Sequence, residues 1–375
     1  MTSLRKPQAS SLLVLVSTPW QLFCALGLLF GPYRHARRRL VLIDQRGDRR
    51  DPWLPLLQSL NLPGLQISSL PAIGKSPLRK LLRTRVVLRQ IAALVDETQP
   101  DEIIGGNDRR VEFQYAMAHA NRRRYTLGAY LDDGTFSYSG LSSLRPRRYE
   151  NLLRRLERWS SRMHYGSWYD KPTSLGSSRW VEYAWLAFPQ HAHPQLATKP
   201  RLALDPYWYR RSEVQALCQR LIEGSQGAAI TRGFDSLLIL PHDHLLRADP
   251  ALRAALSQRL DQALRNGQSV AVKRHPRSSD WLLDVDRSHL AELDSRLPIE
   301  AYAPWLGQAQ IVGTLSTALL SLRWLCPDAR IEALSQHGSL ADPLLGLYQR
   351  LGIGVDAPAP KLLPPVNDPV WLLVG

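Results

Sequence analysis

The feature that most constrains this chain is an alternation of short apolar segments with longer amphipathic segments. In the first half, the apolar segments have the length of buried strands, and Leu78–Thr98 has the three-to-four apolar spacing of a helix. The predicted strands are Leu12–Val16, Leu40–Ile43, Leu65–Ser69, Glu102–Gly105 and Tyr125–Leu131. Strands that alternate with helices form a parallel sheet with crossover helices. The first half is therefore predicted to be a doubly wound α/β domain.

The same alternation begins again in the second half. The predicted strands there are Ser236–Leu240, Ser269–Lys273, Ala309–Gly313 and a weaker Ala329–Leu334, with helices at Pro250–Asn266 and Thr317–Leu325. A chain of 375 residues is long enough for two domains. We predict an α/β fold of two Rossmann-like, doubly wound domains, residues 1–205 and 206–375, which face a central cleft.

Three other segments complete the predicted organisation. A connector lies within Leu196–Leu217, a basic amphipathic helix covers Tyr149–Met163, and a Pro-rich tail follows Asp356.

Residues Ser11–Phe30 are apolar enough to resemble a signal peptide or a membrane span, but Ser17–Pro19 interrupt them. Because a bilayer core cannot satisfy a broken backbone, we predict a strand, a turn and a helix there instead.

The net charge of +15 lies entirely in the first half of the chain. Residues 1–200 hold 30 Lys and Arg against 15 Asp and Glu, whereas the remainder holds 18 of each kind. Such a field attracts nucleic acid, acidic lipid headgroups or an anionic polysaccharide, although an Arg-rich genome would give the same composition. The Arg clusters Arg37–Arg39 and Arg122–Arg124 lack the interleaved aromatic residues of a base-stacking surface, so we expect no nucleic acid.

The three cysteines have no spacing typical of a disulfide framework or a metal site. They are Cys24, Cys218 and Cys326. This usage is typical of a reducing compartment, so we expect a cytoplasmic protein. The sequence also lacks a Walker loop, a glycine-rich dinucleotide motif and paired His or Cys ligands. We therefore expect neither a metal nor a cofactor.

Two adjacent carboxylates follow the predicted strand Tyr125–Leu131. Asp132 and Asp133 precede Gly134, which is a pattern typical of a sharp turn at the edge of a sheet. A carboxylate there can accept a proton from an attacking hydroxyl if burial or a neighbouring charge raises its pKa. A plain Asp-Gly turn without chemistry is the alternative.

A basic motif follows the predicted strand Ser269–Lys273. Pro276 restricts the backbone of His275, and Lys273 adds a positive charge two residues before the imidazole. This combination suits a phosphate that departs with negative charge, although a His-Pro pair alone is common. His242 and His244 also follow a predicted strand, and we interpret them as turn residues.

A third motif joins the predicted strand Ala309–Gly313 to the helix Thr317–Leu325. Its small and hydroxyl-bearing residues are Gly313, Thr314, Ser316 and Thr317. Hydroxyls and free backbone N–H groups at the start of a helix can bind a phosphate without a metal. The same residues could serve only to cap the helix.

Taken in order, the motifs resemble those of bacterial GT-B sialyltransferases, namely the lipooligosaccharide enzymes of glycosyltransferase family 52 and the capsule polysialyltransferases. The family's elements correspond here to Asp132-Asp133-Gly134, Lys273-Arg274-His275-Pro276, Pro298-Ile299-Glu300, Ser316-Thr317 and the opening Thr18-Pro19-Trp20-Gln21. The resemblance covers residues 12–325 as separate short islands. It departs from the family at Pro241-His242, where Gln-Pro is expected, and at Thr317, which replaces a second Ser.

The resemblance implies a role for each matched residue. Asp132 would be the general base, Asp133 and Gly134 would form and orient the turn, and His275 would stabilise or protonate the departing phosphate. The implied donor contacts are Ser316 and Thr317 to the phosphate, Glu300 to the ribose, Lys273 to the cytosine, and Pro276, Gly313, Thr314 and Thr18 around them. Asn107 would contact the donor sugar or the acceptor.

The implied activity is an inverting, metal-independent transfer of sialic acid, or a related nonulosonic acid, from its CMP ester. The acceptor would be an anionic glycan or glycolipid such as lipooligosaccharide or capsule, reached through peripheral contact with an anionic inner membrane. Two alternatives stay open. One is a CMP-Kdo or CDP-glycerol type of transferase, and the other is a basic nucleic-acid- or polysaccharide-binding protein without catalysis.

Overall fold

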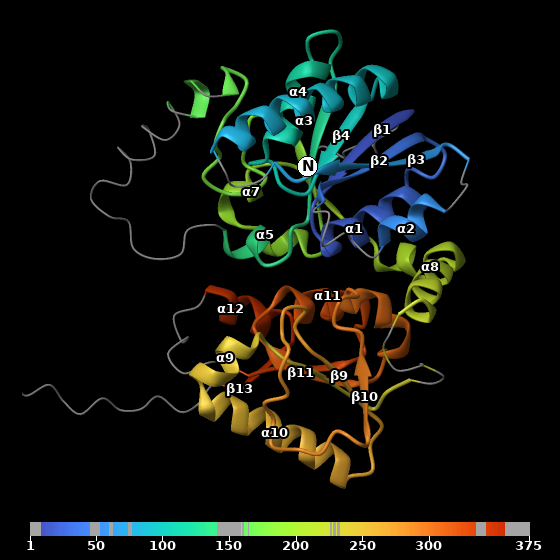
Figure 1. The fold of residues 1–375 in the computed structure, drawn as a ribbon, viewed down its shortest axis with the longest axis vertical. Coiled ribbons are helices and arrows are strands. Elements are labelled where there is room, and N and C mark those ends of the chain that lie inside the picture. Colours follow the sequence, from blue (N-terminus) through green and yellow to red (C-terminus); the bar gives the residue numbers. More distant parts are fainter. Residues whose placement is uncertain are drawn as a thin grey trace, which may run out of the picture.

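The computed structural model describes residues 9–45, 53–59, 63–73, 77–140, 159, 161–163, 165–225, 227, 230, 233–334 and 343–356. Within these residues the chain forms two α/β domains, one above the other in Figure 1. The first contains a parallel sheet in the order β3-β2-β1-β4-β5-β6-β7. Its strands are β1 (Ser11–Val16), β2 (Arg37–Gln45), β3 (Leu65–Pro71), β4 (Glu102–Gly105), β5 (Leu127–Leu131), β6 (Tyr183–Leu186) and β7 (Arg201–Ala203).

The second domain contains a parallel sheet in the order β10-β9-β8-β11-β12-β13. Its strands are β8 (Ser236–Ile239), β9 (Val270–Lys273), β10 (Leu290–Leu293), β11 (Gln310–Thr314), β12 (Arg330–Leu334) and β13 (Gly354–Asp356). When the strands are numbered along the chain within each domain, both sheets contain the spatial order 3-2-1-4-5-6. This is the strand order of a Rossmann fold. The prediction of two doubly wound domains in a GT-B arrangement is confirmed.

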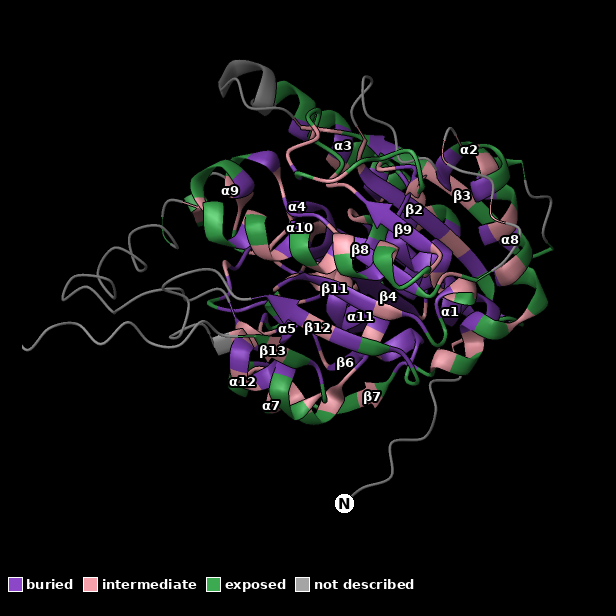
Figure 2. Cartoon of the chain, turned by 90° about the horizontal axis from the view of Figure 1, so that it is seen from below, coloured by how far each residue is buried: buried purple, intermediate pink, exposed green. Residues whose placement is uncertain are grey.

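Helices cover both faces of the sheets, which explains why the central strands are apolar without interruption. On β1, Leu12 and Val14 pack in one core with α1, while Leu13 and Leu15 pack in a second core with α3 and α4. Figure 2 shows the central strands as largely buried and the outward faces of α9 (Asp243–Ala248) and α10 (Pro250–Arg265) as exposed. The helices are α1 (Pro19–Phe30), α2 (Trp53–Gln58), α3 (Pro77–Thr98), α4 (Val111–Ala120), α5 (Phe136–Ser139), η1 (Pro189–His191), α7 (Pro194–Ala197), η2 (Pro206–Arg210), α8 (Ser212–Glu223), α9 (Asp243–Ala248), α10 (Pro250–Arg265), η3 (Ile299–Trp305), α11 (Thr317–Leu325) and α12 (Pro343–Arg350).

Four strands, β6, β7, β10 and β13, lie where the sequence predicted none. The range 196–217, within which a connector was predicted, contains the last strand of the first sheet, β7, and then η2, and the predicted domain boundary after residue 205 lies just beyond β7. Strands β7 and β13 have only three residues each and an exposed or half-buried pattern, so they carry almost no apolar signal. Most of the helix predicted at Tyr149–Met163, and the tail after Asp356, lie outside the described residues.

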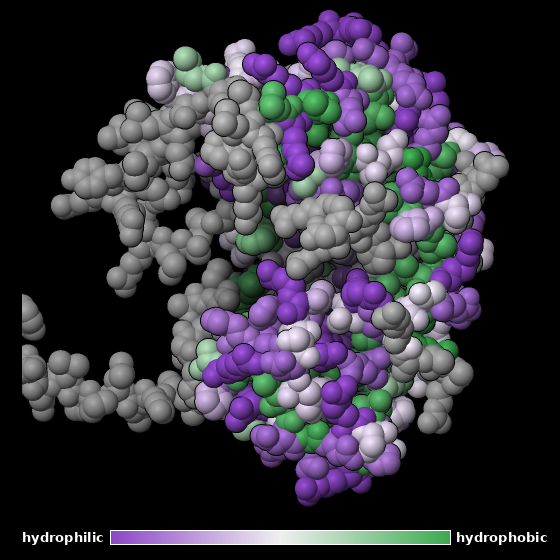
Figure 3. Space-filling model, in the orientation of Figure 1, coloured by the Kyte–Doolittle hydropathy of each residue, from purple (hydrophilic) through white to green (hydrophobic). Residues whose placement is uncertain are grey.

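The segment Ser11–Phe30 forms β1 and α1, as predicted, with the turn at Ser17 and Thr18 between them. Every helix among the described residues is too short or too polar to cross a membrane. On the face drawn in Figure 3, hydrophilic residues are spread over both domains.

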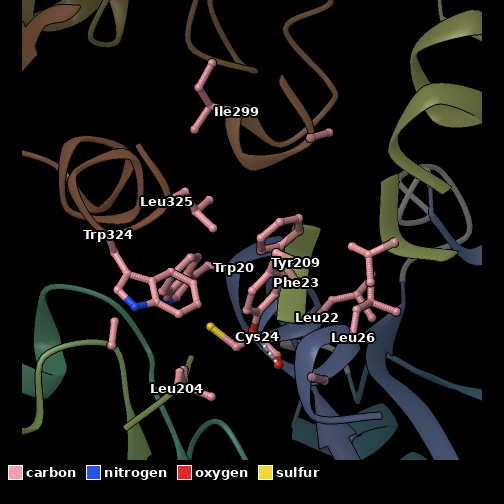
Figure 4. Close-up of a cluster of buried hydrophobic side chains, with 14 of the residues drawn as sticks. Trp20, Leu22, Phe23, Cys24, Leu26, Leu204, Tyr209, Ile299, Trp324 and Leu325 are labelled. Carbon is pink, nitrogen blue, oxygen red and sulfur yellow. Dashed lines mark hydrogen bonds between the residues drawn. The ribbon is translucent and has the colours of Figure 1, made fainter. Parts of the chain in front are cut away.

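An aromatic cluster on α1 joins the two domains (Figure 4). Tyr209 of η2 stacks on Phe23 with ring centroids 4.7 Å apart, and it meets Trp324 of α11 edge-on at 4.9 Å. Trp20 lies 5.8 Å from Trp324 in a second edge-on contact. A Cβ atom at Gly27 would lie 2.2 Å from the Tyr209 ring, so this close packing of η2 on α1 requires glycine. The cluster therefore connects the first residues of α1 to the second domain.

Candidate functional site

The two acids after β5 are held by the first turn of α1. Strands β1, β4 and β5 are neighbours, so their carboxyl ends meet at one edge of the sheet. There Trp20 Nε1 donates a hydrogen bond to Asp132 Oδ1 at 3.3 Å, and Gln21 Nε2 donates one to Asp133 Oδ1. The opening turn and the acidic motif, 112 residues apart in sequence, thus form one unit.

Asp132 is completely buried, and its carboxylate accepts hydrogen bonds on both oxygens. Besides Trp20, Oδ1 accepts from the Gly134 backbone at 2.7 Å and from the Ser137 hydroxyl at 3.2 Å. Oδ2 accepts from the Tyr138 hydroxyl and from the Ala187 backbone N–H. Burial raises the pKa of Asp132, and these hydrogen bonds oppose the rise. The environment is that of a side chain that organises the turn.

Asp133 is only half-buried, and burial raises the pKa of its carboxyl group to about 7. The neighbouring charges of Asp132 and Asp108 act in the same direction, while the hydrogen bond from Gln21 opposes them. A carboxylate with a pKa near neutrality can accept a proton from a hydroxyl and later release it.

Gln21 is itself fixed from two sides. Its Oε1 accepts the backbone N–H of Ser17 at 2.8 Å, and a Cβ atom at Gly106 would lie 2.1 Å from its Cδ. Thr18 Oγ1 accepts the backbone N–H of Gln21 at 3.2 Å and so caps α1. Asn107 Oδ1 accepts the backbone N–H of Arg109 at 3.0 Å within the next turn. Both predicted contact residues, Thr18 and Asn107, thus lie at the same sheet edge as the acids.

In the second domain, Lys273 and Glu300 are close enough to interact electrostatically. Lys273 ends β9 and is buried, and desolvation lowers the pKa of its ammonium group to about 8 although Asp294 and Glu300 counter the effect. Glu300 is buried at the start of η3, where burial raises its pKa. Its Oε1 accepts a hydrogen bond from the Ser321 hydroxyl at 2.6 Å.

The small-residue turn after β11 contains a hydroxyl that has no hydrogen-bond partner within the described part of the chain. The Ser316 backbone N–H donates to the Tyr348 hydroxyl of α12 at 2.8 Å, but Ser316 Oγ is enclosed and makes no hydrogen bond with any described residue. Gly313 and Thr314 are buried at the end of the strand. A Cβ atom at Gly313 would lie 3.2 Å from that of Ile239 on β8, so the strands pack closely here.

The acidic turn and the Ser-Thr turn touch across the two domains. The Thr135 backbone N–H donates to Thr317 Oγ1 at 3.3 Å. Gly134 has a φ of +75°, and a Cβ atom there would lie 2.4 Å from Thr317 Cγ2. Glycine is therefore required at this position both by the backbone conformation and by the contact. The structure places two sequence-predicted motifs face to face.

His275 lies in the loop after β9 and is half-buried, with Pro276 exposed beside it. Burial lowers the pKa of its imidazole, as do the charges of Arg277, His242 and Lys273. Its nearest ring is that of His242, at 5.1 Å between centroids. No hydrogen bond links His275 to Ser316 or to Asp133.

Several residues of the site had no role in the sequence prediction. Trp20 and Gln21 stood within a quoted motif, and Ser321 follows Thr317 by about one helical turn, so the sequence held a signal for them. Tyr138 and Tyr348 had none, because their partners Asp132 and Ser316 are reached only through the fold.

The sequence matches no protein-family profile and no curated protein. Among solved structures, UDP-N-acetylglucosamine 2-epimerase from Rickettsia bellii is similar at 14% identity and a TM-score of 0.46, over 91% of this chain and 87% of that one. UGT2 of Phytolacca americana, complexed with UDP-2fluoro-glucose and pterostilbene, is similar at 10% identity and a TM-score of 0.48, over 94% and 86%. UDP-GlcNAc 2-epimerase from Neisseria meningitidis, bound to UDP-GlcNAc, has 9% identity and a TM-score of 0.46, over 91% and 90%. The scores are low, and the fold assignment depends on the strand orders described above.

Proposed function

We propose that this protein is an inverting glycosyltransferase that moves sialic acid, or a related nonulosonic acid, from its CMP ester to an acceptor glycan. The observation that carries the proposal is the contact between the Gly134 turn and Thr317. This contact sets a carboxylate with a pKa near 7 on one side of the domain boundary. On the other side it sets Ser316 Oγ, a hydroxyl that makes no hydrogen bond with any described residue. An acceptor hydroxyl activated by the carboxylate would then lie close to a donor phosphate bound by the Ser316 hydroxyl.

In this mechanism Asp133, rather than the expected Asp132, removes the proton from the acceptor hydroxyl. Asp133 is the less buried acid, and only its neighbour is enclosed by hydrogen bonds on both oxygens. The hydroxyl oxygen attacks the anomeric carbon as the bond to the phosphate oxygen breaks, through an oxocarbenium-like state. The electron pair of that bond leaves with CMP, whose phosphate Ser316, Thr317 and His275 stabilise. Asp132 positions the turn.

The donor's nucleoside is assigned to the pair formed by Lys273 and Glu300. A buried carboxylate can accept hydrogen bonds from ribose hydroxyls, and an ammonium group can donate to the cytosine carbonyl. The mutual electrostatic stabilisation of the two side chains and the bond from Ser321 support an ordered pair.

The expected contact with an anionic membrane is part of the proposal, and the outer face of α3 supports it. Leu82 and Val86 are 65% and 51% exposed on this helix. Arg83, Arg85 and Arg89 are exposed beside them. Apolar side chains flanked by arginines are typical of helices that lie on anionic lipid surfaces. An acceptor glycolipid at that surface would then be close to the first domain.

The test is a screen of donor hydrolysis by the purified protein in EDTA, with CMP-sialic acid, CMP-Kdo, CDP-glycerol and a UDP-sugar as separate substrates. We expect release of CMP from CMP-sialic acid, and loss of that release in Asp133→Asn when an acceptor is added. Preferential hydrolysis of CMP-Kdo or CDP-glycerol would replace the donor and leave the transferase class intact. Failure with every donor, combined with tight binding of a polysaccharide, would favour the non-catalytic alternative.

A further inference from the structure

Two histidines from neighbouring loops lie side by side at the edge of the second sheet. His242 follows β8 and His275 follows β9, and these strands are paired in register from Ser236 and Val270 onward. The imidazole centroids are 5.1 Å apart, and the ring planes are inclined by 57°. Both side chains are half-buried. The sequence alone indicated only a turn at His242.

Each ring is oriented by the same local hydrogen bond. His242 Nδ1 accepts the backbone N–H of His244 at 3.1 Å, and His275 Nδ1 accepts the backbone N–H of Arg277 at 3.2 Å. A ring nitrogen that accepts a hydrogen bond carries the lone pair, so the proton of the neutral imidazole is on Nε2. Neither Nε2 atom forms a hydrogen bond with a described residue. The pair therefore offers two N–H donors even when both rings are uncharged.

The surroundings of the pair favour an anion over a cation. Burial lowers the pKa of His275 most, and the positive charges of Arg277 and Lys273 lower it further, so cationic groups lie near the ring. Asp243 is the acid that acts in the opposite direction, and its carboxylate accepts the backbone N–H groups of Ser279 at 3.0 Å and Asp280 at 3.2 Å. A metal ion would need lone pairs on the imidazoles, and those on Nδ1 are already used.

We propose that His242 and His275 form a two-imidazole site for a phosphate group, in which each ring donates one Nε2–H to the same anion. Rings at this separation can both reach the oxygens of a single phosphate. Where this phosphate belongs to the nucleotide donor, the inference rests on the proposed function. His242 is then a second phosphate-binding residue beside His275, at the position where the sialyltransferases that the sequence resembles have Gln-Pro.

Amide substitutions test the geometry, because Gln places its N–H₂ near the position of Nε2 and Asn places its amide near that of Nδ1. Binding of inorganic phosphate and of CMP is measured by calorimetry. His242→Asn should weaken both by about tenfold to a hundredfold, the usual worth of a hydrogen bond to a charged group, whereas His242→Gln should retain most of the affinity. His244→Asn is the matched control and should bind as the wild type does. Nitrogen-15 NMR of the imidazoles should show the Nε2–H tautomer in both rings.

The outcomes separate this inference from the proposed function. Phosphate binding that depends on His242, with no hydrolysis of any CMP-sugar, would support the two-imidazole site and reject the transferase. Hydrolysis and CMP binding unaffected by His242→Asn would support the transferase and overturn the site. Zinc binding by the two rings in place of phosphate, or an Nδ1–H tautomer in either ring, would also overturn it.

Discussion

Asp132 and Asp133 are adjacent in the chain, yet their environments differ, and the proposed function gives each a different role. Replacing Asp133 by Asn keeps the side-chain size and the oxygen that accepts from Gln21, but it removes the proton acceptor. We expect transfer to fall by about 10²–10⁴ with CMP affinity retained. Transfer rates and CMP calorimetry on the same preparation provide the measurement.

Asp132→Asn is the control for this prediction. This substitution places an N–H₂ donor opposite the Ala187 N–H, which is also a donor. The lost hydrogen bond lowers the free energy of unfolding by roughly 1–3 kcal/mol. We therefore expect a lower melting temperature in Asp132→Asn and no loss of melting temperature in Asp133→Asn. If Asp132→Asn folds normally and loses more transfer than Asp133→Asn, the first acid is the base after all.

The pKa of Asp133 also predicts a pH profile. A base must be ionised to act, so kcat/KM should rise with pH up to about 7 and level off above it, and Asp133→Asn should lack this rise. The raised pKa means that the folded state holds a proton that the unfolded state, with a value near 3.8, has lost. Stability contributed by the protonated group is therefore lost as pH rises from about 4 through 7. Melting temperatures of the variant should depend less on pH across that interval.

At the scale of the elements, the turn after β5 and the start of α11 form a direct contact between the domains. Gly134→Ala adds a methyl group at positive φ, which costs about 1–3 kcal/mol, and directs it at Thr317 Cγ2. We expect a lower melting temperature and weaker transfer. Thr317→Ser removes that methyl group and keeps the hydroxyl, so it should restore part of both losses in the double variant. Equal behaviour of the single and double variants would mean that the two turns are apart in solution.

Helix α3 is the element whose exposed face supports membrane contact. Changing Arg83, Arg85 and Arg89 to Gln should reduce sedimentation with anionic vesicles by roughly 10²-fold at low salt, since each basic residue near such a surface contributes about 1 kcal/mol. Neutral vesicles should bind neither protein.

The matched control makes the same change of charge in exposed arginines beyond the first sheet, at Arg220, Arg265 and Arg330. It should bind vesicles as the wild type does. If both triple variants lose binding equally, the attraction depends on net charge and α3 is not the docking face.

At the scale of the whole molecule, the residues proposed to bind the nucleotide lie in the second domain, and the two acids lie in the first. A ligand that binds only the folded protein stabilises it by about 2.7 kcal/mol at a hundred times its Kd. We expect CMP to raise the melting temperature more than UMP or GDP at equal concentration, and Lys273→Met to reduce the difference. Equal shifts from all three nucleotides would contradict the cytidine site at Lys273 and Glu300.

Local pattern was sufficient for the architecture. The apolar run Leu12–Val16 and the period of Leu78–Thr98 depend on neighbours in sequence, so β1, α3 and most strands of both sheets were predictable. The order of the sheets follows from the handedness and shortness of crossovers. The same local pattern predicted that the Asp-Asp-Gly, His-Pro and Ser-Thr motifs follow parallel strands, at their carboxyl ends. Short edge strands such as β7 were missed because three half-exposed residues carry no period.

By itself, the sequence determined the fold class and the identity of the turns that meet at the site. Only the tertiary structure decided which of the two acids is enclosed, since the enclosure depends on Trp20 and Ala187 from distant segments. It also decided that Gly134 meets Thr317 and that His242 is the neighbour of His275. The physical reason is common to all three. Desolvation and hydrogen bonding act through space over a few ångströms, and residues up to 182 positions apart reach that range only after both domains have packed.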